Sequence, residues 1–193
     1  SFPFFHKIQK HSIFAVTNAM LTIIVPYVTT FYDKGQTDRV ARYLSATTKL
    51  GLLVSSIIAS LVYLFLWLFI DELFPKYTNA LGILPYVFLA FILLNFNTPI
   101  PFLKAKGKLL SLTKASIITT IFSFINSYLL SKYFGFNGMI LSLVINFSSL
   151  GFLVWYYAYK DLKLKFTVIP SKEEINVFKI YLSHFASKFI FKF

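Results

Sequence analysis

The sequence contains no cysteine, and charged residues make up only 13% of its 193 positions. The absence of cysteine excludes disulfides, thiolate metal sites and a cysteine nucleophile. Acidic residues are the scarcest charged type, since 7 Asp and Glu stand against 19 Lys and Arg. Hydrophobic residues reach 57%, compared with about 45–50% in ordinary globular chains. Because this excess lies in long uncharged runs, the composition excludes an ordinary soluble domain and predicts a protein embedded in lipid.

Histidine is scarce as well. His6, His11 and His184 show no metal-ligand spacing with one another or with a carboxylate, so we expect neither a metal site nor a cofactor. The net charge of +12 would favour nucleic-acid binding in a soluble protein. Here the basic residues flank hydrophobic segments, and we expect membrane lipid rather than nucleic acid as the partner.

Five hydrophobic segments are long enough to cross a bilayer. A hydrocarbon core about 30 Å thick requires roughly 20 apolar residues in a helix. The segments run over residues 12–32, 50–70, 80–103, 115–134 and 137–159. Their interiors contain no Asp, Glu, Arg or His, and Lys132 near the end of the fourth is their one Lys. Residues 1–165 are therefore predicted to form an all-α, multi-pass transmembrane helical bundle.

The positive residues predict the orientation of the bundle, because Lys and Arg are retained on the cytoplasmic side. The loops after the first and third spans and the carboxy-terminal tail hold 15 of the 19 Lys and Arg residues. We therefore expect a protein of the cytoplasmic membrane with its carboxy terminus in the cytoplasm. The first span would then enter from outside, which requires a further helix before Ser1 or an external amino terminus.

Small residues repeat at four-residue intervals in two spans. Gly51, Ser55 and Ala59 share one face of the second span, and Gly138 and Ser142 share a face of the fifth. Such faces allow helices to approach closely in membranes.

The tail, residues 166–193, has the pattern of a cytoplasmic amphipathic helix. Ser171 and Glu174 form a possible capping box after Pro170. Apolar residues then recur at gaps of three and four, as expected for a helix that lies on the membrane surface.

Four segments, taken in order, resemble the polysaccharide flippases of the multidrug/oligosaccharidyl-lipid/polysaccharide exporter (MATE-like) superfamily. They are Pro26 followed by residues 33–36 and a basic stretch through Arg42, residues 73–80 with Leu84, Gly107-Lys108, and residues 133–139. The chain departs from the family at Pro75, where a glycine is common. The resemblance implies that the five spans are the last five of twelve, most of the carboxy-terminal lobe of a two-lobed transporter whose amino-terminal lobe is missing here. Its members move lipid-linked oligosaccharide or polysaccharide precursors by alternating access.

Other functions stay open at the level of the sequence. The chain could export drugs or small solutes within the same superfamily, or serve as a structural membrane subunit. It could also be the membrane domain of a lipid-sugar glycosyltransferase. Against an enzyme, the acids that precede the tail include no D-x-D pair, so we expect a transporter and no catalytic residues.

Polar residues within the spans are the candidates for a substrate cavity, because an anionic, hydroxylated head group needs polar partners. They are Asn18, Thr22, Asn95, Asn97, Thr119, Ser123, Asn126 and Asn146. Hydrogen bonding between helices would explain the same residues. Basic residues could attract the head group to the cytoplasmic entrance, namely Arg39, Arg42, Lys104, Lys106 and Lys108. Membrane topology and attraction to anionic lipid would explain these equally well.

Overall fold

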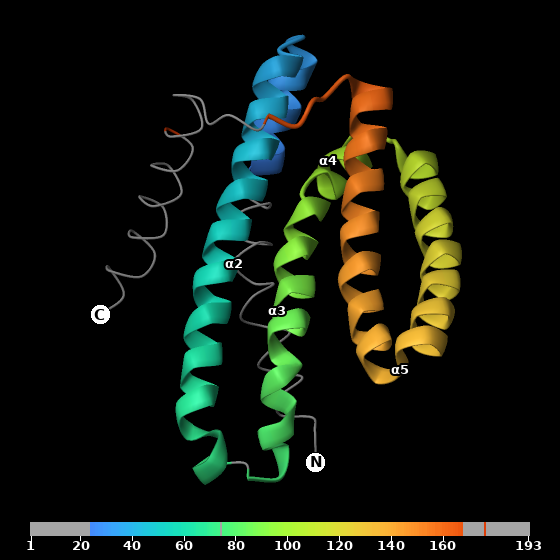
Figure 1. Cartoon of the computed structure of the whole chain (residues 1–193). Helices are drawn as coiled ribbons and strands as arrows, with labels where there is room; N and C mark the ends of the chain where they lie inside the picture. The colour runs from blue at the N-terminus through green and yellow to red at the C-terminus, as the bar shows by residue number, and fades with distance from the viewer. Residues whose placement is uncertain (1–23, 74, 168–175, 177–193) are drawn as a thin grey trace.

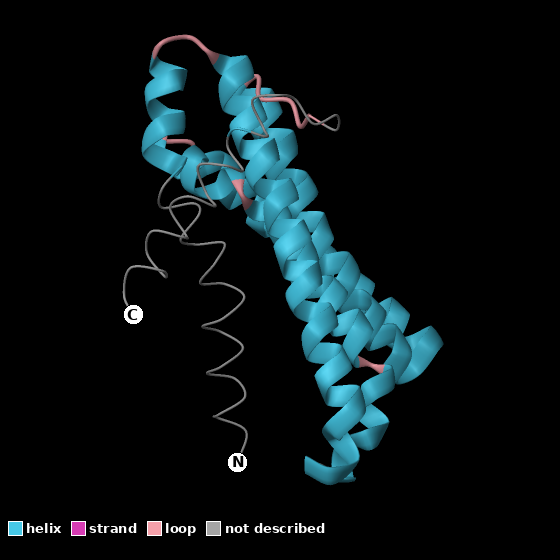
Figure 2. Cartoon of the chain, turned by 90° about the vertical axis from the view of Figure 1, so that its left-hand side faces the viewer, coloured by secondary structure: helices cyan, strands magenta, loops and turns pink. Residues whose placement is uncertain are grey.

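The computed structural model describes residues 24–73, 75–167 and 176, and the regular structure within them is helical throughout (Figure 2). A helix over residues 24–33 comes first. The later elements, in chain order, are α2 (Thr37–Leu73), the 3-10 helix η1 (Pro75–Gly82), α3 (Leu84–Leu93), the 3-10 helix η2 (Leu94–Asn97), α4 (Pro99–Ala105) and α5 (Leu109–Leu162). The helices α2, α3 and α5 lie side by side along a common direction, and α4 continues from the end of α3 (Figure 1). The predicted all-α architecture is confirmed for this part of the chain.

Three helical stretches of the described chain are long and apolar enough to cross a membrane. They are Thr37–Glu72, the continuous run Leu84–Ala105, and Leu109–Leu162. The predicted spans over 50–70, 115–134 and 137–159 fall within them. Of the span predicted over 80–103, residues 84–103 do so, whereas residues 80–82 belong to η1. The predicted first span, 12–32, lies outside the described residues up to position 23. The described chain thus has the candidate spans of a multi-pass membrane protein.

The helix α5 is one stretch of 54 residues by its hydrogen bonds, but it folds back on itself at Gly135. The backbone there has φ 58° and ψ −135°, a conformation that is open almost only to glycine. Residues 109–134 and 136–162 form two antiparallel arms, each about 40 Å long at 1.5 Å per residue (Figure 1). Each arm contains one predicted span.

Pro99 interrupts the second candidate span because it has no backbone N–H to donate to the carbonyl of Asn95. The chain tightens into η2 before the proline. Both the amide and the hydroxyl of Thr98 donate to the Asn95 carbonyl oxygen, at 3.3 Å and 2.5 Å. The carbonyl of Asn95, which loses its usual helical hydrogen bond because of Pro99, therefore accepts hydrogen bonds from Thr98 instead.

The start of α2 differs from the expectation from sequence. Residues 37–49, described above as part of a basic loop, are helical and continue directly into the predicted span. The whole helix of 37 residues is about 55 Å long, more than a 30 Å hydrocarbon core can cover. Its first turns are instead buried by protein, since Val40, Leu44 and Thr48 are fully enclosed.

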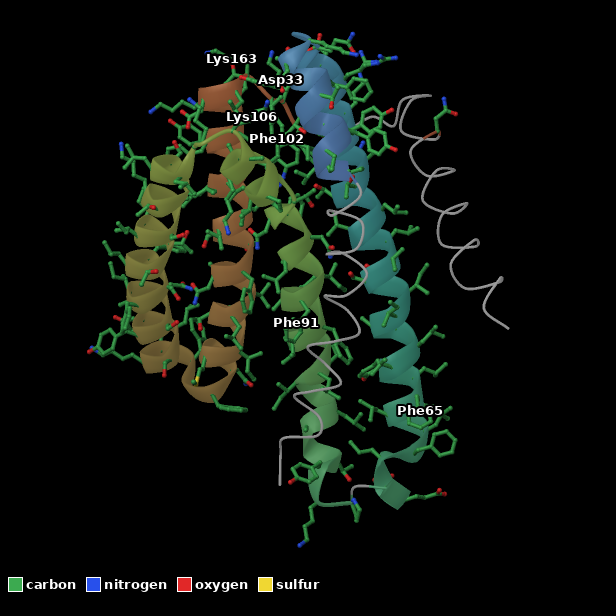
Figure 3. All side chains as sticks on the ribbon, turned by 180° about the vertical axis from the view of Figure 1, so that it is seen from behind. Asp33, Phe65, Phe91, Phe102, Lys106 and Lys163 are labelled. Carbon is green, nitrogen blue, oxygen red and sulfur yellow. The ribbon has the colours of Figure 1, made fainter. Side chains whose placement is uncertain are left out.

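The core lies toward the end where α2 begins and α5 ends. Its largest fully buried side chains include Phe102, Leu103, Leu44 and Val154. The far half of α2 buries much less and exposes Phe65, Trp67, Leu68 and Phe69 among others. Figure 3 shows Phe102 at the packed end and Phe65 near the opposite end. So much exposed apolar surface is typical of helices surrounded by lipid.

Small residues make the close contacts that their spacing predicted. A Cβ atom added at Gly138 would collide with the carbonyl oxygen of Leu130 on the other arm of α5. One added at Gly51 would collide with the side chain of Asn95. Both glycines are therefore needed for the observed distance between helices.

Labelling of single cysteines tests the hairpin in α5. Because the sequence has no cysteine, Lys108→Cys, Lys132→Cys and Lys163→Cys each introduce one thiol without removing another. We expect an impermeant thiol reagent to label positions 108 and 163 from one side of the membrane and position 132 from the other. An α5 that crosses only once would place 108 and 163 on opposite sides.

Replacement of Gly138 tests the packing of the arms. We expect Gly138→Ala to lower the free energy of unfolding by about 1–3 kcal/mol, because the backbone of Leu130 must move to admit the methyl group. Gly82→Ala is the matched control, since nothing lies within 4 Å of an added Cβ there. Thermal unfolding in detergent measures both, and equal midpoints for the two variants would contradict the packing.

Candidate functional site

The two ends of the described bundle differ in charge. The first end, called the basic end below, contains the 33–36 turn, the first turns of α2, the turn between α4 and α5, and the end of α5 with the residues after it (Figure 1). Its described basic residues are Lys34, Arg39, Arg42, Lys49, Lys104, Lys106, Lys108, Lys114, Lys160, Lys163 and Lys165. Its described acids are Asp33, Asp38 and Asp161. At the other end Lys76 and Lys132 are balanced by Asp71 and Glu72.

Of the entrance candidates, Lys106 is engaged within the protein. Its ammonium forms an ion pair with Asp33, across 73 residues of sequence, and lies 5.0 Å from the centroid of the Tyr32 ring. The side chain of Lys106 is 15% exposed. Its charge is largely compensated, which leaves it less able to attract an anionic substrate than its position in sequence suggests. Figure 3 shows Lys106 and Asp33 together at the basic end.

The other entrance candidates are distributed over the same end. Arg39 is exposed, donates to the Gln36 side-chain oxygen at 3.1 Å and lies over the ring of Phe31. Lys104 is exposed, and Arg42 and Lys108 are half-buried. The fold therefore brings these residues to one end of the bundle, but it does not gather them at a single point.

Asn95 is a packing residue in this structure. It is buried, and its amide nitrogen donates to Ser55 Oγ at 3.0 Å and to the Ile92 carbonyl at 2.8 Å. The bond to Ser55 joins η2 to α2 beside Gly51. Hydrogen bonding between helices thus accounts for this amide.

Asn126 and Asn146 bond across the two arms of α5. Asn126 Nδ2 donates to Asn146 Oδ1 at 3.2 Å, and Asn146 Nδ2 donates to Ser127 Oγ at 3.2 Å. Ser127 in turn donates to Ser142, whose hydroxyl donates to the carbonyl of Met139. Two amides and two hydroxyls thus satisfy one another between apolar helices, where unpaired groups would cost several kcal/mol.

The remaining cavity candidates fall into three groups. Thr119 donates to the carbonyl of Ala115 on its own helix at 2.8 Å, and Ser123 is half-buried. Asn18 and Thr22 lie outside the described residues. Asn97 differs from the others, because its side-chain oxygen is buried and has no hydrogen-bond partner.

Trp155 carries a second unpaired polar atom that sequence reasoning missed. Its indole nitrogen is buried without a partner, although a buried tryptophan N–H usually finds an acceptor. Its ring packs against Phe166 with centroids 5.0 Å apart. In the sequence, Trp155 lies close to the basic residues after position 159. That position indicates a tryptophan at the membrane interface and does not predict a buried one.

Residues 163–167, called the strap below, leave α5 and return across the bundle (Figure 1). Leu164 is fully buried, and the amide of Thr167 donates to Ser45 Oγ on α2 at 2.9 Å. Phe166 lies against Trp155 and Phe96. Contacts with the bundle therefore continue through Thr167, the last residue of this described stretch. The amphipathic helix predicted for the tail lies outside the described residues, apart from position 176.

No protein-family model, curated protein or solved structure matches this chain. Within the part of the chain that the structure describes, no three His, Asp or Glu residues lie close enough to hold a metal ion. The described bundle thus presents a strongly basic end, self-satisfied polar pairs between its helices and two unpaired buried polar atoms. Any assignment of function rests on these features and on the sequence.

A double-mutant cycle tests the pair formed by Asn126 and Asn146. We expect Asn126→Ala, Asn146→Ala and the double variant to yield a coupling energy of about 0.6–1.7 kcal/mol, the range of hydrogen bonds between membrane helices. Unfolding in detergent supplies the four free energies. Additive effects would show that the two amides do not interact. Thr120→Ala combined with Asn146→Ala is the control, because Thr120 bonds to its own helix.

Proposed function

We propose that this chain is most of the carboxy-terminal lobe of a MATE-like flippase. It would move lipid-linked oligosaccharide or polysaccharide precursors across the cytoplasmic membrane by alternating access. The carboxy terminus would lie in the cytoplasm, and the amino-terminal lobe would supply the rest of the cavity.

The observation that carries the proposal concerns the turns. Three of the four segments that resemble the flippase family contain Gly35, Gly107 and Gly135, and these are the glycines with positive φ among the described residues. The fourth segment spans η1, the connection between α2 and α3. Gly35, Gly107 and Gly135 thus lie at reversals between helices, where the fold requires a positive φ, whereas Pro26 and residues 37–42 of the first segment lie within helices. This agreement supports a common architecture more strongly than scattered identities within apolar helices would.

The surface chemistry suits an amphipathic lipid-linked substrate. The basic end would favour an anionic pyrophosphate head, because exposed positive charge raises the local concentration of anions. The exposed apolar faces of α2 and α5 would lie in lipid, where a polyprenyl tail could remain during transfer. For such a substrate, only the head group needs a polar path across the membrane, because the tail can stay in the lipid.

Asn97 is the best candidate for a group that contacts the head within the membrane. Its unpaired side-chain oxygen can accept a hydrogen bond from a sugar hydroxyl, whereas Asn95, Asn126 and Asn146 already bond within the protein. Because this oxygen is buried here, a sugar hydroxyl would reach it only in another conformation of the alternating-access cycle, and would then form its hydrogen bond in surroundings of low polarity.

Reconstitution of the full-length protein tests the proposal directly. A labelled lipid-linked oligosaccharide is placed in one leaflet of proteoliposomes and its appearance in the other is followed. We expect faster transfer than in protein-free vesicles. Equal rates would end the flippase proposal.

Two variants then separate substrate contact from helix packing. Asn97→Leu should slow transfer about tenfold and leave stability unchanged or higher, since it removes an unpaired buried acceptor. Asn146→Leu, the control, should lower stability because it leaves Asn126 unpaired. If Asn97→Leu transfers lipid at the wild-type rate, Asn97 does not contact the substrate.

A further inference from the structure

The strap places lysines on the outer surface in a regular pattern. Between positions 163 and 166 the residues alternate, with Lys163 and Lys165 exposed, Leu164 fully buried and Phe166 packed on the core. From Leu164 onward this is the alternation of an extended chain that has one face on protein, whereas Lys163 caps α5 in a left-handed conformation. The bond from Thr167 to Ser45 fixes the far end of the strap.

A third lysine and two tyrosines adjoin the strap. Lys160 is exposed in the last turn of α5, and Tyr156 and Tyr159 are 54% and 46% exposed. The ammonium of Lys165 lies 5.9 Å from the centroid of the Tyr159 ring. We call Lys160, Lys163, Lys165, Tyr156 and Tyr159 the carboxy-terminal patch. Figure 3 shows Lys163 at the basic end of the molecule.

The nearest acid in sequence does not neutralise this patch. Asp161 is half-buried and accepts a hydrogen bond from Ser111 on the other arm of α5. Lys106, by contrast, is paired with Asp33 elsewhere on the same end. The three lysines of the patch therefore present positive charge outward while the core holds their backbone in place.

We propose that the carboxy-terminal patch binds the phosphate head groups of anionic phospholipids in the leaflet that it faces. Tyrosine side chains favour the depth of the head groups, with the ring near the acyl chains and the hydroxyl in water. Lysines at this depth are attracted to anionic lipid, and a backbone fixed in advance reduces the entropy lost on binding. The proposal does not depend on transport of any substrate.

The position of Lys163 supports lipid binding. Its φ of 58° is a left-handed conformation, where glycine is the usual residue at the end of a helix. A lysine there also benefits from the negative end of the helix dipole. The helix dipole stabilises a lysine here whatever the lipid. Binding of head groups differs, because the stability that Lys163 contributes would then depend on the charge of the lipid.

The test measures how lipid charge changes thermal stability. The full chain is purified in neutral detergent, and its unfolding temperature is followed as phosphatidylglycerol or phosphatidylcholine is added. We expect phosphatidylglycerol to stabilise the protein at lower concentrations, and Lys163→Gln combined with Lys165→Gln to weaken that apparent affinity about tenfold to thirtyfold. Lys163→Arg combined with Lys165→Arg should retain the affinity, because it keeps both charges.

Lys76→Gln combined with Lys132→Gln is the matched control. It removes the same charge from two exposed residues at the opposite end and should leave the affinity for phosphatidylglycerol unchanged. If both double variants lose the same affinity for phosphatidylglycerol, net charge alone explains the binding and the proposal is overturned. Stabilisation by glycerol phosphate at the same concentrations would assign the patch to free phosphate instead, and equal effects of the two lipids would also overturn it.

Discussion

The structure depends on one constraint, namely that a chain surrounded by lipid must satisfy its backbone hydrogen bonds within itself. The described residues meet it with helices and confine irregular backbone to short connections. At Pro99, where a helix must lose a bond, Thr98 occupies the orphaned carbonyl with both its amide and its hydroxyl. At Gly135 the reversal takes a single residue, so α5 changes direction with little exposed backbone.

The same constraint explains the polar side chains. An amide in hydrocarbon is expensive unless it is paired, and Asn95, Asn126 and Asn146 are paired with residues on neighbouring helices. Their bonds also align the helices, since each joins residues far apart in sequence. The unpaired oxygen of Asn97 and the unpaired nitrogen of Trp155 are therefore the informative groups, because packing alone does not account for them.

Much of this architecture could be predicted from the sequence, because hydrophobic length and helix-breaking residues are local properties. The run over 50–70 and residues 84–103 of the run over 80–103 fall within candidate spans, and the turn at Gly135 falls between the two predicted spans that form the arms of α5. The helix over residues 37–49 was missed because its charged residues suggested a loop, while its buried face depends on distant partners. The pairing of Lys106 with Asp33 and of Thr167 with Ser45 could not be foreseen for the same reason.

Lipid contact also explains where hydroxyl groups occur on the exposed faces. Thr113 and Thr120 are exposed residues of the first arm of α5, and each donates to the carbonyl four residues earlier on its own helix. Such bonds let a hydroxyl face hydrocarbon without an unsatisfied donor. The side chains of Asn126, Ser127, Ser142 and Asn146, by contrast, bond from one arm of α5 to the other. The described hydroxyls and amides with these bonds thus divide into those that bond to their own helix and those that join helices. Asn97 and Trp155 carry the buried polar atoms that belong to neither group among the described residues.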